Sequence, residues 1–190
     1  MDGRGGRGVE REHLRLTEVD AGGRIRASIR FDLDGRRAAS VEMSDRFRRG
    51  EGRRIPVAAR EALDALLHHD FERLRAALPE DFVFHDHRRT GLGRLEGGAA
   101  FVASLAPLAE LSPDFCIETL YTVALGEHGL LEVARVFGTL AASGGAFETV
   151  YARLGIWRGE RIVAMELFEP EDLELARARF EELRPAPATR

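Results

Sequence analysis

An α+β domain built on an antiparallel sheet is the fold class that this sequence predicts. Four long segments in the second half of the chain alternate apolar and polar residues, as strands with one buried face do: residues 115–125, 130–140, 147–157 and 161–168. The segments between them are too short for the crossover that a parallel pair of strands needs, so neighbouring strands must be antiparallel. Apolar residues at helical spacing before and after these strands supply the α part.

Three helices are predicted ahead of the long strands. Asp70 is placed to cap the start of the second helix, and Ser112-Pro113-Asp114 ends the third. A short strand over residues 82–87 and a glycine-containing loop over 88–97 separate the second helix from the third, and a last helix follows at 172–183. The expected inward positions of the first three helices are Ala59, Ala62, Leu63, Leu66 and Leu67, then Phe71, Leu74 and Leu78, then Phe101, Leu105, Leu108 and Leu111.

The chain is expected to contain an additional segment ahead of the main domain. Residues 1–12 hold almost nothing to bury and are predicted to be disordered. The expected order after them is a β-hairpin with a helix (13–45), a charged linker (46–54), the main domain (55–184) and a frayed tail (185–190).

The additional segment partly repeats the end of the main domain. At a constant offset of 137 residues, Gly22, Arg24, Ile25, Ala27 and Phe31 match Gly159, Arg161, Ile162, Ala164 and Phe168. One interpretation is coincidence between two strands rich in Arg and Ala. The other is that residues 13–45 are the closing hairpin and helix of a preceding copy of the domain, which would make the chain the end of a tandem array or its descendant.

Composition excludes several classes of function. Lys and Arg number 28 against 32 Asp and Glu, giving a net charge of −4, so no basic face for nucleic acid or an anionic membrane is expected. No run of about 18 apolar residues predicts a membrane-spanning helix. The single cysteine, Cys116, cannot form an internal disulfide, which favours a reducing, cytoplasmic compartment.

The order of elements from residue 55 to 183 resembles the nuclear transport factor 2-like superfamily and, within it, the SnoaL-like domains. Residues 63–86, 97–105 and 159–168 carry the resemblance. Phe84-His85-Asp86-His87-Arg88 and Phe180-Glu181-Glu182-Leu183 are similar to SnoaL-like domains that occur in tandem in actinobacterial multidomain regulators. The resemblance implies a cone-shaped curved sheet, packed with three helices around a central apolar pocket, plus a C-terminal helix. It specifies chemistry poorly, because one fold hosts many functions.

Asp86 is the first candidate for chemistry, since it matches the general-base aspartate of the related ketosteroid isomerases. The hydrogen-bond donors that stabilise the enolate in those enzymes are missing, because the family's tyrosine and protonated aspartate fall at about Ala62 and Ala152. Steroid isomerisation is therefore not expected. The alternative for Asp86 is an ion pair at the pocket rim with Arg88, Arg89 or Arg94.

Other residues are candidates for a weaker reason. His85 and His87 share the strand face opposite Asp86 and are candidate acid–base groups, but no further residues complete a metal site. Polar residues among apolar ones are typical of a strand that lines a pocket, as in Arg135-Phe137-Thr139 and Thr149-Tyr151-Arg153. Tyr151 could equally be a core tyrosine, and Arg135 could pair with Glu148 or Glu166. The candidate ligand-binding residues are Phe84, Arg135, Phe137, Tyr151 and Glu166.

Two functions follow from these observations. The first is a module that binds a small apolar or aromatic molecule, or a partner, without catalysis. The second is a small cyclase, isomerase or hydrolase that uses Asp86 with His85 or His87 as acid and base. Neither needs a cofactor. The resemblance also leads us to expect a homodimer that pairs through the outer face of the sheet.

Overall fold

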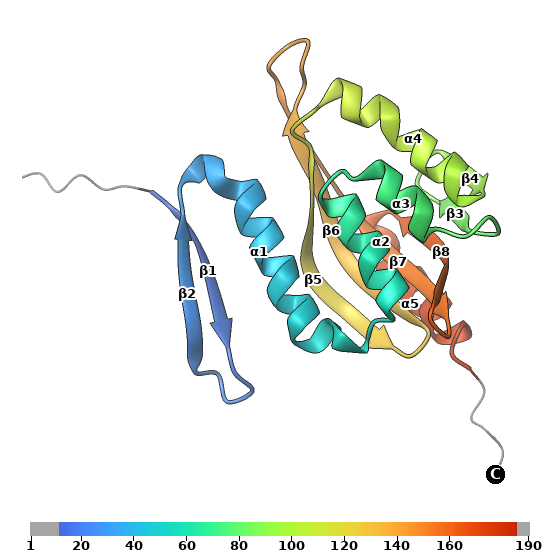
Figure 1. The fold of residues 1–190 in the computed structure, drawn as a ribbon, viewed down its shortest axis with the longest axis horizontal. Coiled ribbons are helices and arrows are strands. Elements are labelled where there is room, and N and C mark those ends of the chain that lie inside the picture. Colours follow the sequence, from blue (N-terminus) through green and yellow to red (C-terminus); the bar gives the residue numbers. More distant parts are fainter. Residues whose placement is uncertain (1–11, 186–190) are drawn as a thin grey trace, which may run out of the picture. The chain divides into compact units, whose positions relative to one another are not determined.

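The computed structural model describes residues 12–185, so the expectations for residues 1–11 and 186–190 lie outside the described range (Figure 1). The chain divides into two compact units, one up to Met43 and one from Ser44 onward. The first unit contains the antiparallel hairpin of β1 (Leu14–Val19) and β2 (Ile25–Phe31), a 3-10 turn (Leu33–Gly35) and the start of α1 (Arg36–Arg49). Among the described residues, no helix is long and apolar enough to cross a membrane.

The second unit is built on a curved sheet of six strands, in the order β4-β3-β8-β7-β6-β5. The four predicted long strands are confirmed as β5 (Cys116–Gly126), β6 (Gly129–Thr139), β7 (Ala146–Arg158) and β8 (Arg161–Phe168), and they pair antiparallel in sequence order. The short strand is β3 (Val83–Asp86). It pairs parallel with β8, because the long stretch of chain between the two allows a crossover. The loop expected over residues 88–97 is partly a strand, since β4 (Gly93–Glu96) turns back to pair with β3.

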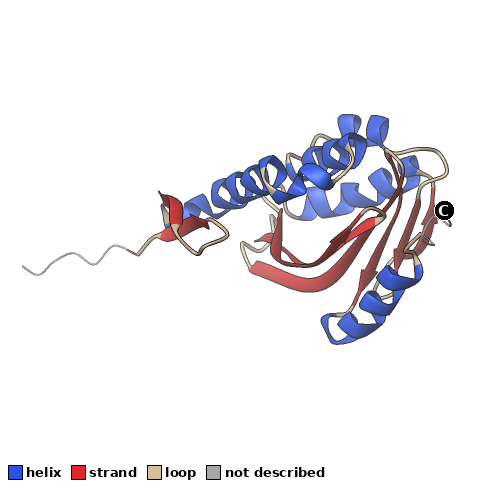
Figure 2. Cartoon of the chain, turned by 90° about the horizontal axis from the view of Figure 1, so that it is seen from below, coloured by secondary structure: helices blue, strands red, loops and turns tan. Residues whose placement is uncertain are grey.

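Helices cover both faces of this sheet (Figure 2). The three predicted helices are α2 (Val57–Leu67), α3 (Phe71–Ala77) and α4 (Gly98–Leu111) on one face, and α5 (Leu173–Glu182) lies on the other. Asp70 caps α3 as predicted, because its carboxylate accepts a hydrogen bond of 3.0 Å from the backbone N–H of Arg73. The fold is therefore the α+β arrangement that the sequence predicts.

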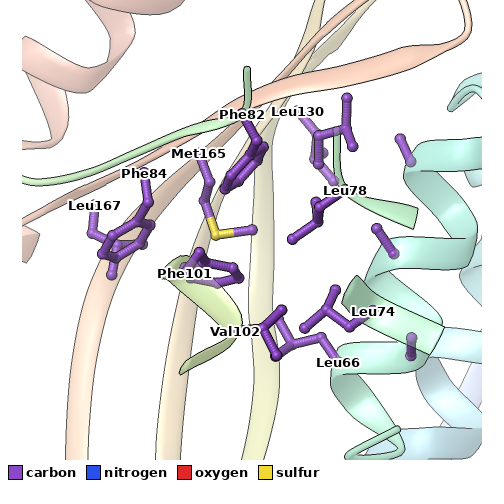
Figure 3. Close-up of a cluster of buried hydrophobic side chains, with 14 of the residues drawn as sticks. Leu66, Leu74, Leu78, Phe82, Phe84, Phe101, Val102, Leu130, Met165 and Leu167 are labelled. Carbon is purple, nitrogen blue, oxygen red and sulfur yellow. The ribbon is translucent and has the colours of Figure 1, made fainter. Parts of the chain in front are cut away.

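Two separate apolar cores hold the second unit together. The larger lies between the sheet and helices α2, α3 and α4, and Figure 3 shows Phe84 of β3, Phe101 of α4, and Met165 and Leu167 of β8 gathered in it. The smaller lies between the sheet and α5, around Leu154, Phe168 and Phe180. Strand side chains alternate between these cores, so each strand residue faces either α2–α4 or α5.

The segment expected to be a linker, residues 46–54, is helical instead. Helix α1 continues to Arg49, and a 3-10 turn follows at Glu51–Arg54. Phe47 packs against the larger core, and Arg48 forms an ion pair with Asp64 of α2. The charged residues that suggested a linker therefore lie on helical turns, and one of them, Arg48, helps to anchor these turns to α2.

The first unit repeats the end of the second in structure as well as in sequence. Phe31 and Phe168 end β2 and β8, and three-residue 3-10 turns and then helices begin at the same offset of 137 residues, with α1 and α5 starting at Arg36 and Leu173. The hydrogen bonds that close the two turns also correspond, from Gly35 N to Asp32 O at 2.9 Å and from Asp172 N to Glu169 O at 3.0 Å. Each hairpin also has a register shift, and the residues left out of the pairing, Arg26 of β2 and Val163 of β8, are again 137 residues apart. The correspondence thus extends beyond the two strands to the bulge, the turn and the start of the helix.

Candidate functional site

A cavity of about 390 Å³ lies between the sheet and helices α2 and α4. Most of its wall is apolar and comes from α4 and the inner face of the sheet, and the loop after β3 contributes Arg88 and Leu92. The polar side chains of the lining are Asp86, Arg88, Ser104, Thr149, Tyr151 and Arg153. An apolar cavity with a few convergent polar groups is the usual form of a small-molecule site.

Asp86 lies at the end of β3, with its side chain fully buried against Arg88. Its carboxylate accepts hydrogen bonds from Arg88 Nε at 2.8 Å and Nη2 at 2.7 Å, and from the backbone N–H groups of Arg88 and Leu92, both at 3.2 Å. Burial alone would raise the pKa of Asp86, but the hydrogen bonds and charge of Arg88 outweigh it and hold that pKa below its ordinary value. Asp86 is therefore an ionised, fully occupied acceptor.

The loop after β3 is wrapped tightly around this carboxylate. A Cβ atom added at Gly91 would lie 2.4 Å from Cγ of Asp86, so only glycine allows the backbone to pass there. The same loop supplies the Leu92 N–H that Asp86 accepts and the Arg88 guanidinium, which lies 5.2 Å from the centre of the Tyr151 ring. The loop thus fixes Asp86, Arg88 and Tyr151 as one group.

A second buried ion pair borders the cavity deeper inside the domain. Arg153 of β7 donates from Nε to Oε1 of Glu132 on β6 at 2.7 Å, and Thr119 of β5 donates to the other oxygen of Glu132 at 2.8 Å. The two charged side chains are 9% and 5% exposed. Arg153 also borders a smaller void of about 50 Å³ near Ser44 and Phe47, so the pair stands between the two spaces.

Tyr151 brings a hydroxyl group into this cavity. The residue is only 5% exposed, and its hydroxyl makes no hydrogen bond with any residue from 12 to 185. The hydroxyl oxygen keeps some accessible surface instead of being enclosed by protein. Because Tyr151 lines the cavity, the oxygen faces its open space. Burial raises the pKa of Tyr151, which keeps the hydroxyl protonated at neutral pH.

His85 and His87 point to the other face of the sheet, as their spacing from Asp86 predicts. Their rings lie 3.8 Å apart, and Nε2 of His87 is 3.1 Å from Oε2 of Glu166. The other oxygen of Glu166 accepts from Nε of Arg179 on α5 at 3.2 Å. Burial and the neighbouring His87 lower the pKa of His85. Neither histidine lines the cavity, and among the residues described no group of His, Cys, Asp and Glu could hold a metal ion.

The candidate ligand-binding residues divide between the two faces in the same way. Phe84 and Tyr151 line the cavity with Asp86, whereas Glu166, Arg135 and Phe137 do not. Arg135 lies on the outer face of the sheet, where it pairs with Glu118 and, at 3.3 Å, with Glu148. The pairing with Glu148 was one of the two alternatives for Arg135. The inward residues of β6 are the alternate ones, namely Leu130, Glu132, Ala134 and Val136.

The sequence profile of the SnoaL-like domain matches residues 59–165, more than half of the chain. The chain belongs to the SnoaL-like domain family. No curated protein matches its sequence.

Solved structures of the same architecture are similar to this SnoaL-like domain. One is a protein of ketosteroid isomerase-like fold from Catenulispora acidiphila in complex with trimethylamine, with 16% identity over 60% of this chain and 85% of that one and a TM-score of 0.49. Another is an NTF2-like protein of unknown function from Burkholderia pseudomallei, with 16% identity over 68% and 95% of the two chains and a TM-score of 0.49. A third is an NTF2-like protein from Anabaena variabilis, with 17% identity over 58% and 85% and a TM-score of 0.48.

In this SnoaL-like domain, alanines occupy the two positions where the related isomerases have their hydrogen-bond donors. Ala62 is part of the larger core, and Ala152 faces α5 instead of the cavity. The cavity-lining neighbours of Ala152 are Tyr151 and Arg153, so the only hydroxyl at this point of β7 is that of Tyr151.

The pair formed by Glu132 and Arg153 was missed from the sequence, although a signal existed. In the structure Thr139 of β6 pairs with Ala146 of β7, and that register places Glu132 directly opposite Arg153; the turn expected at residues 141–145 would have shifted the pairing by one residue. Glu132 is the only acid on its face of β6 and Arg153 the only base on its face of β7, and an acid directly opposite a base on buried strand faces indicates an ion pair.

Proposed function

We propose that this domain binds a small apolar or aromatic molecule in the 390 Å³ cavity and does not transform it chemically. The observation that carries the proposal is the cavity itself: a largely apolar space with its charged groups collected beside Asp86 and Arg153. Such a space favours ligands that remove apolar surface from water, at about 25 cal/mol for each Å² buried.

The state of Asp86 supports binding over catalysis. A general base needs a lone pair directed at the proton that it abstracts, and a pKa near the working pH. The Asp86 carboxylate already accepts four hydrogen bonds, and its pKa is lowered instead of raised. His85 and His87, the possible partners in acid–base chemistry, lie on the opposite face of the sheet near Glu166.

A neutral fluorescent probe tests the proposal. N-phenyl-1-naphthylamine fluoresces strongly in apolar surroundings, and we expect saturable enhancement with the full chain. Ser104→Trp should reduce that binding at least tenfold, because Ser104 lines the cavity and the indole would fill it. Ala103→Trp is the matched control, since Ala103 is exposed on the same helix and does not line the cavity.

The two tryptophan variants also define the negative result. Equal probe binding by Ser104→Trp and Ala103→Trp would place the probe elsewhere, and no saturable binding by the unmodified chain would remove the proposal. Circular dichroism of both variants checks that each is folded.

A further inference from the structure

Both carboxylates at the cavity already accept hydrogen bonds from arginine, whereas several hydrogen-bond donors that line it are unused. Both oxygens of Asp86 accept from Arg88, and both oxygens of Glu132 accept, from Arg153 and Thr119. The Asp86 side chain has no exposed surface, and that of Glu132 is 5% exposed. A ligand donor entering the cavity would therefore find each carboxylate already holding a guanidinium group.

Donors do remain available. Arg88 donates hydrogen bonds from Nε and Nη2 to Asp86, and its Nη1 has no partner among residues 12–185. Arg153 donates from Nε and Nη2 to Glu132, and its Nη1 likewise has no partner among these residues. The Tyr151 hydroxyl is the third, and none of these three atoms is sealed inside protein. Two of the three residues, Tyr151 and Arg153, are more than nine-tenths buried.

These donors are close together. The Arg88 guanidinium lies over the Tyr151 ring, and Arg153 follows Tyr151 by two positions on the same face of β7. Each of these donors lacks a protein acceptor and faces the cavity, so a ligand that displaces water from the cavity must supply an acceptor in its place. A ligand oxygen placed among them would restore those bonds, and bonds from a guanidinium to a charged oxygen are the stronger kind.

We propose that the ligand is an apolar or aromatic acid whose carboxylate is held by Arg88, Tyr151 and Arg153. This inference rests on the proposed binding function and adds the chemical class of the ligand. The hydrocarbon part occupies the wall around Phe101, Leu105 and Val136, and the carboxylate lies at the end of β3. Amines of the same shape should bind more weakly, because they bring only donors to a site whose unused guanidinium groups are donors and whose two carboxylates already hold an arginine.

Three compounds of one shape test the charge preference on the full chain at neutral pH: 2-naphthoate, 2-naphthylmethylamine and 2-methylnaphthalene. Calorimetry or displacement of the neutral fluorescent probe measures each affinity. We expect 2-naphthoate to bind at least tenfold more tightly than the amine. Equal affinities of acid and amine, or tighter binding of the amine, would overturn the inference.

Tyr151→Phe then tests the place of the carboxylate. The variant removes one hydroxyl and leaves both ion pairs intact, so it should fold normally. We expect it to bind 2-naphthoate about tenfold more weakly, the usual effect of one hydrogen bond to a charged group, and 2-methylnaphthalene as before. Tyr121→Phe is the matched control, because Tyr121 is the other tyrosine and is 53% exposed on β5.

The outcomes separate the two proposals. If the neutral probe binds but 2-naphthoate does not displace it better than the amine does, the ligand class is wrong and the binding function stands. If Tyr151→Phe weakens the acid and the hydrocarbon equally, the hydroxyl supports only the shape of the cavity and the carboxylate site is wrong. If neither the probe nor any naphthyl compound binds, both proposals fail.

Discussion

Asp86 shows how burial changes what a single residue does. At a rim it would contribute little to stability, but it is buried and holds the Arg88 guanidinium and two backbone N–H groups. Asp86→Asn should lower the free energy of unfolding by about 3 kcal/mol, because it leaves a partly buried Arg88 without its counter-charge. Chemical denaturation of the unmodified chain and of the variant near pH 7 measures the difference.

The lowered pKa of Asp86 also predicts how this difference in unfolding free energy depends on pH. The pKa of Asp86 is lower in the folded state than the value of about 3.9 expected after unfolding. The stabilisation is therefore complete above about pH 4 and is lost as the pH falls through the folded-state pKa. We expect the two stability curves to converge in acid. A difference that stayed constant down to pH 2 would show that Asp86 acts through packing and not through its charge.

Gly91 is the residue whose importance composition alone could not reveal. Gly91→Ala would place a methyl group against the Asp86 carboxylate, so the loop or Asp86 must move and the ion pair with Arg88 is disturbed. A melting temperature lowered by several degrees is expected. Gly155→Ala is the control within the same domain, since the added Cβ would be 4.0 Å from its nearest neighbour, the carbonyl oxygen of Leu130. Equal melting of the two variants would contradict the tight wrapping described for this loop.

At the scale of elements, alternation and turn length were sufficient to predict β5 to β8, and helical spacing was sufficient for α2 to α5. Which face a strand presents was harder. The sequence placed Asp86 on one face of β3 and the two histidines on the other, because successive side chains of a strand point to opposite faces. On β6 the polar residues Arg135 and Thr139 suggested a pocket, but the opposite face is the inner one. Ion pairs occur on both faces of this sheet, so polarity could not assign the face.

The anchoring of α1 could not be predicted, because the contacts of Phe47 and Arg48 are made with residues far along the chain. They have a testable consequence for truncation. A chain beginning at Ser44 should unfold with nearly the stability of the full chain, since the compact unit begins there. A chain beginning at Glu51 loses Phe47 from the core and the Arg48 partner of Asp64, and should melt at a clearly lower temperature. Thermal melts followed by circular dichroism compare the three chains, and identical melting of both truncated forms would restore the linker interpretation.

For the molecule as a whole, we propose pairing of two copies through the part of the outer sheet that α5 leaves uncovered. On β5, the edge strand of the sheet, Tyr121 is 53% exposed opposite Val133, and Leu120, at the bulge beside it, is 41% exposed. Sedimentation at tens of micromolar should show a dimer, and Leu120→Arg should produce a monomer without changing the fold. Leu175→Arg is the control, because Leu175 is 59% exposed on α5 and should leave the dimer intact. A monomer of the unmodified chain at that concentration would count against the pairing.

We propose that residues 14–49 are a second copy of the closing unit formed by β7, β8 and α5, with one face altered. The residues of β2 that correspond to Met165 and Leu167, which line the cavity in the second unit, are Ser28 and Arg30. Leu14, Leu16, Ala27, Ile29 and Phe31 share the other face and are half-buried. The side that would complete an apolar core has thus become polar, which removes the driving force for docking onto one.

Hydrogen exchange of the full chain can show what this altered copy does. Strand β8 is hydrogen-bonded on both edges, to β7 and β3, whereas among the described strands β1 and β2 pair only with each other. Amides on the outer edges of β1 and β2 should therefore exchange within seconds, and those between the two strands should be only modestly protected, because an isolated hairpin is marginally stable. Amides of β8 should be protected by orders of magnitude more. Protection of the outer-edge amides equal to that of β8 would mean that a further strand covers them, and if that protection fell on dilution the strand would come from a second copy of this chain.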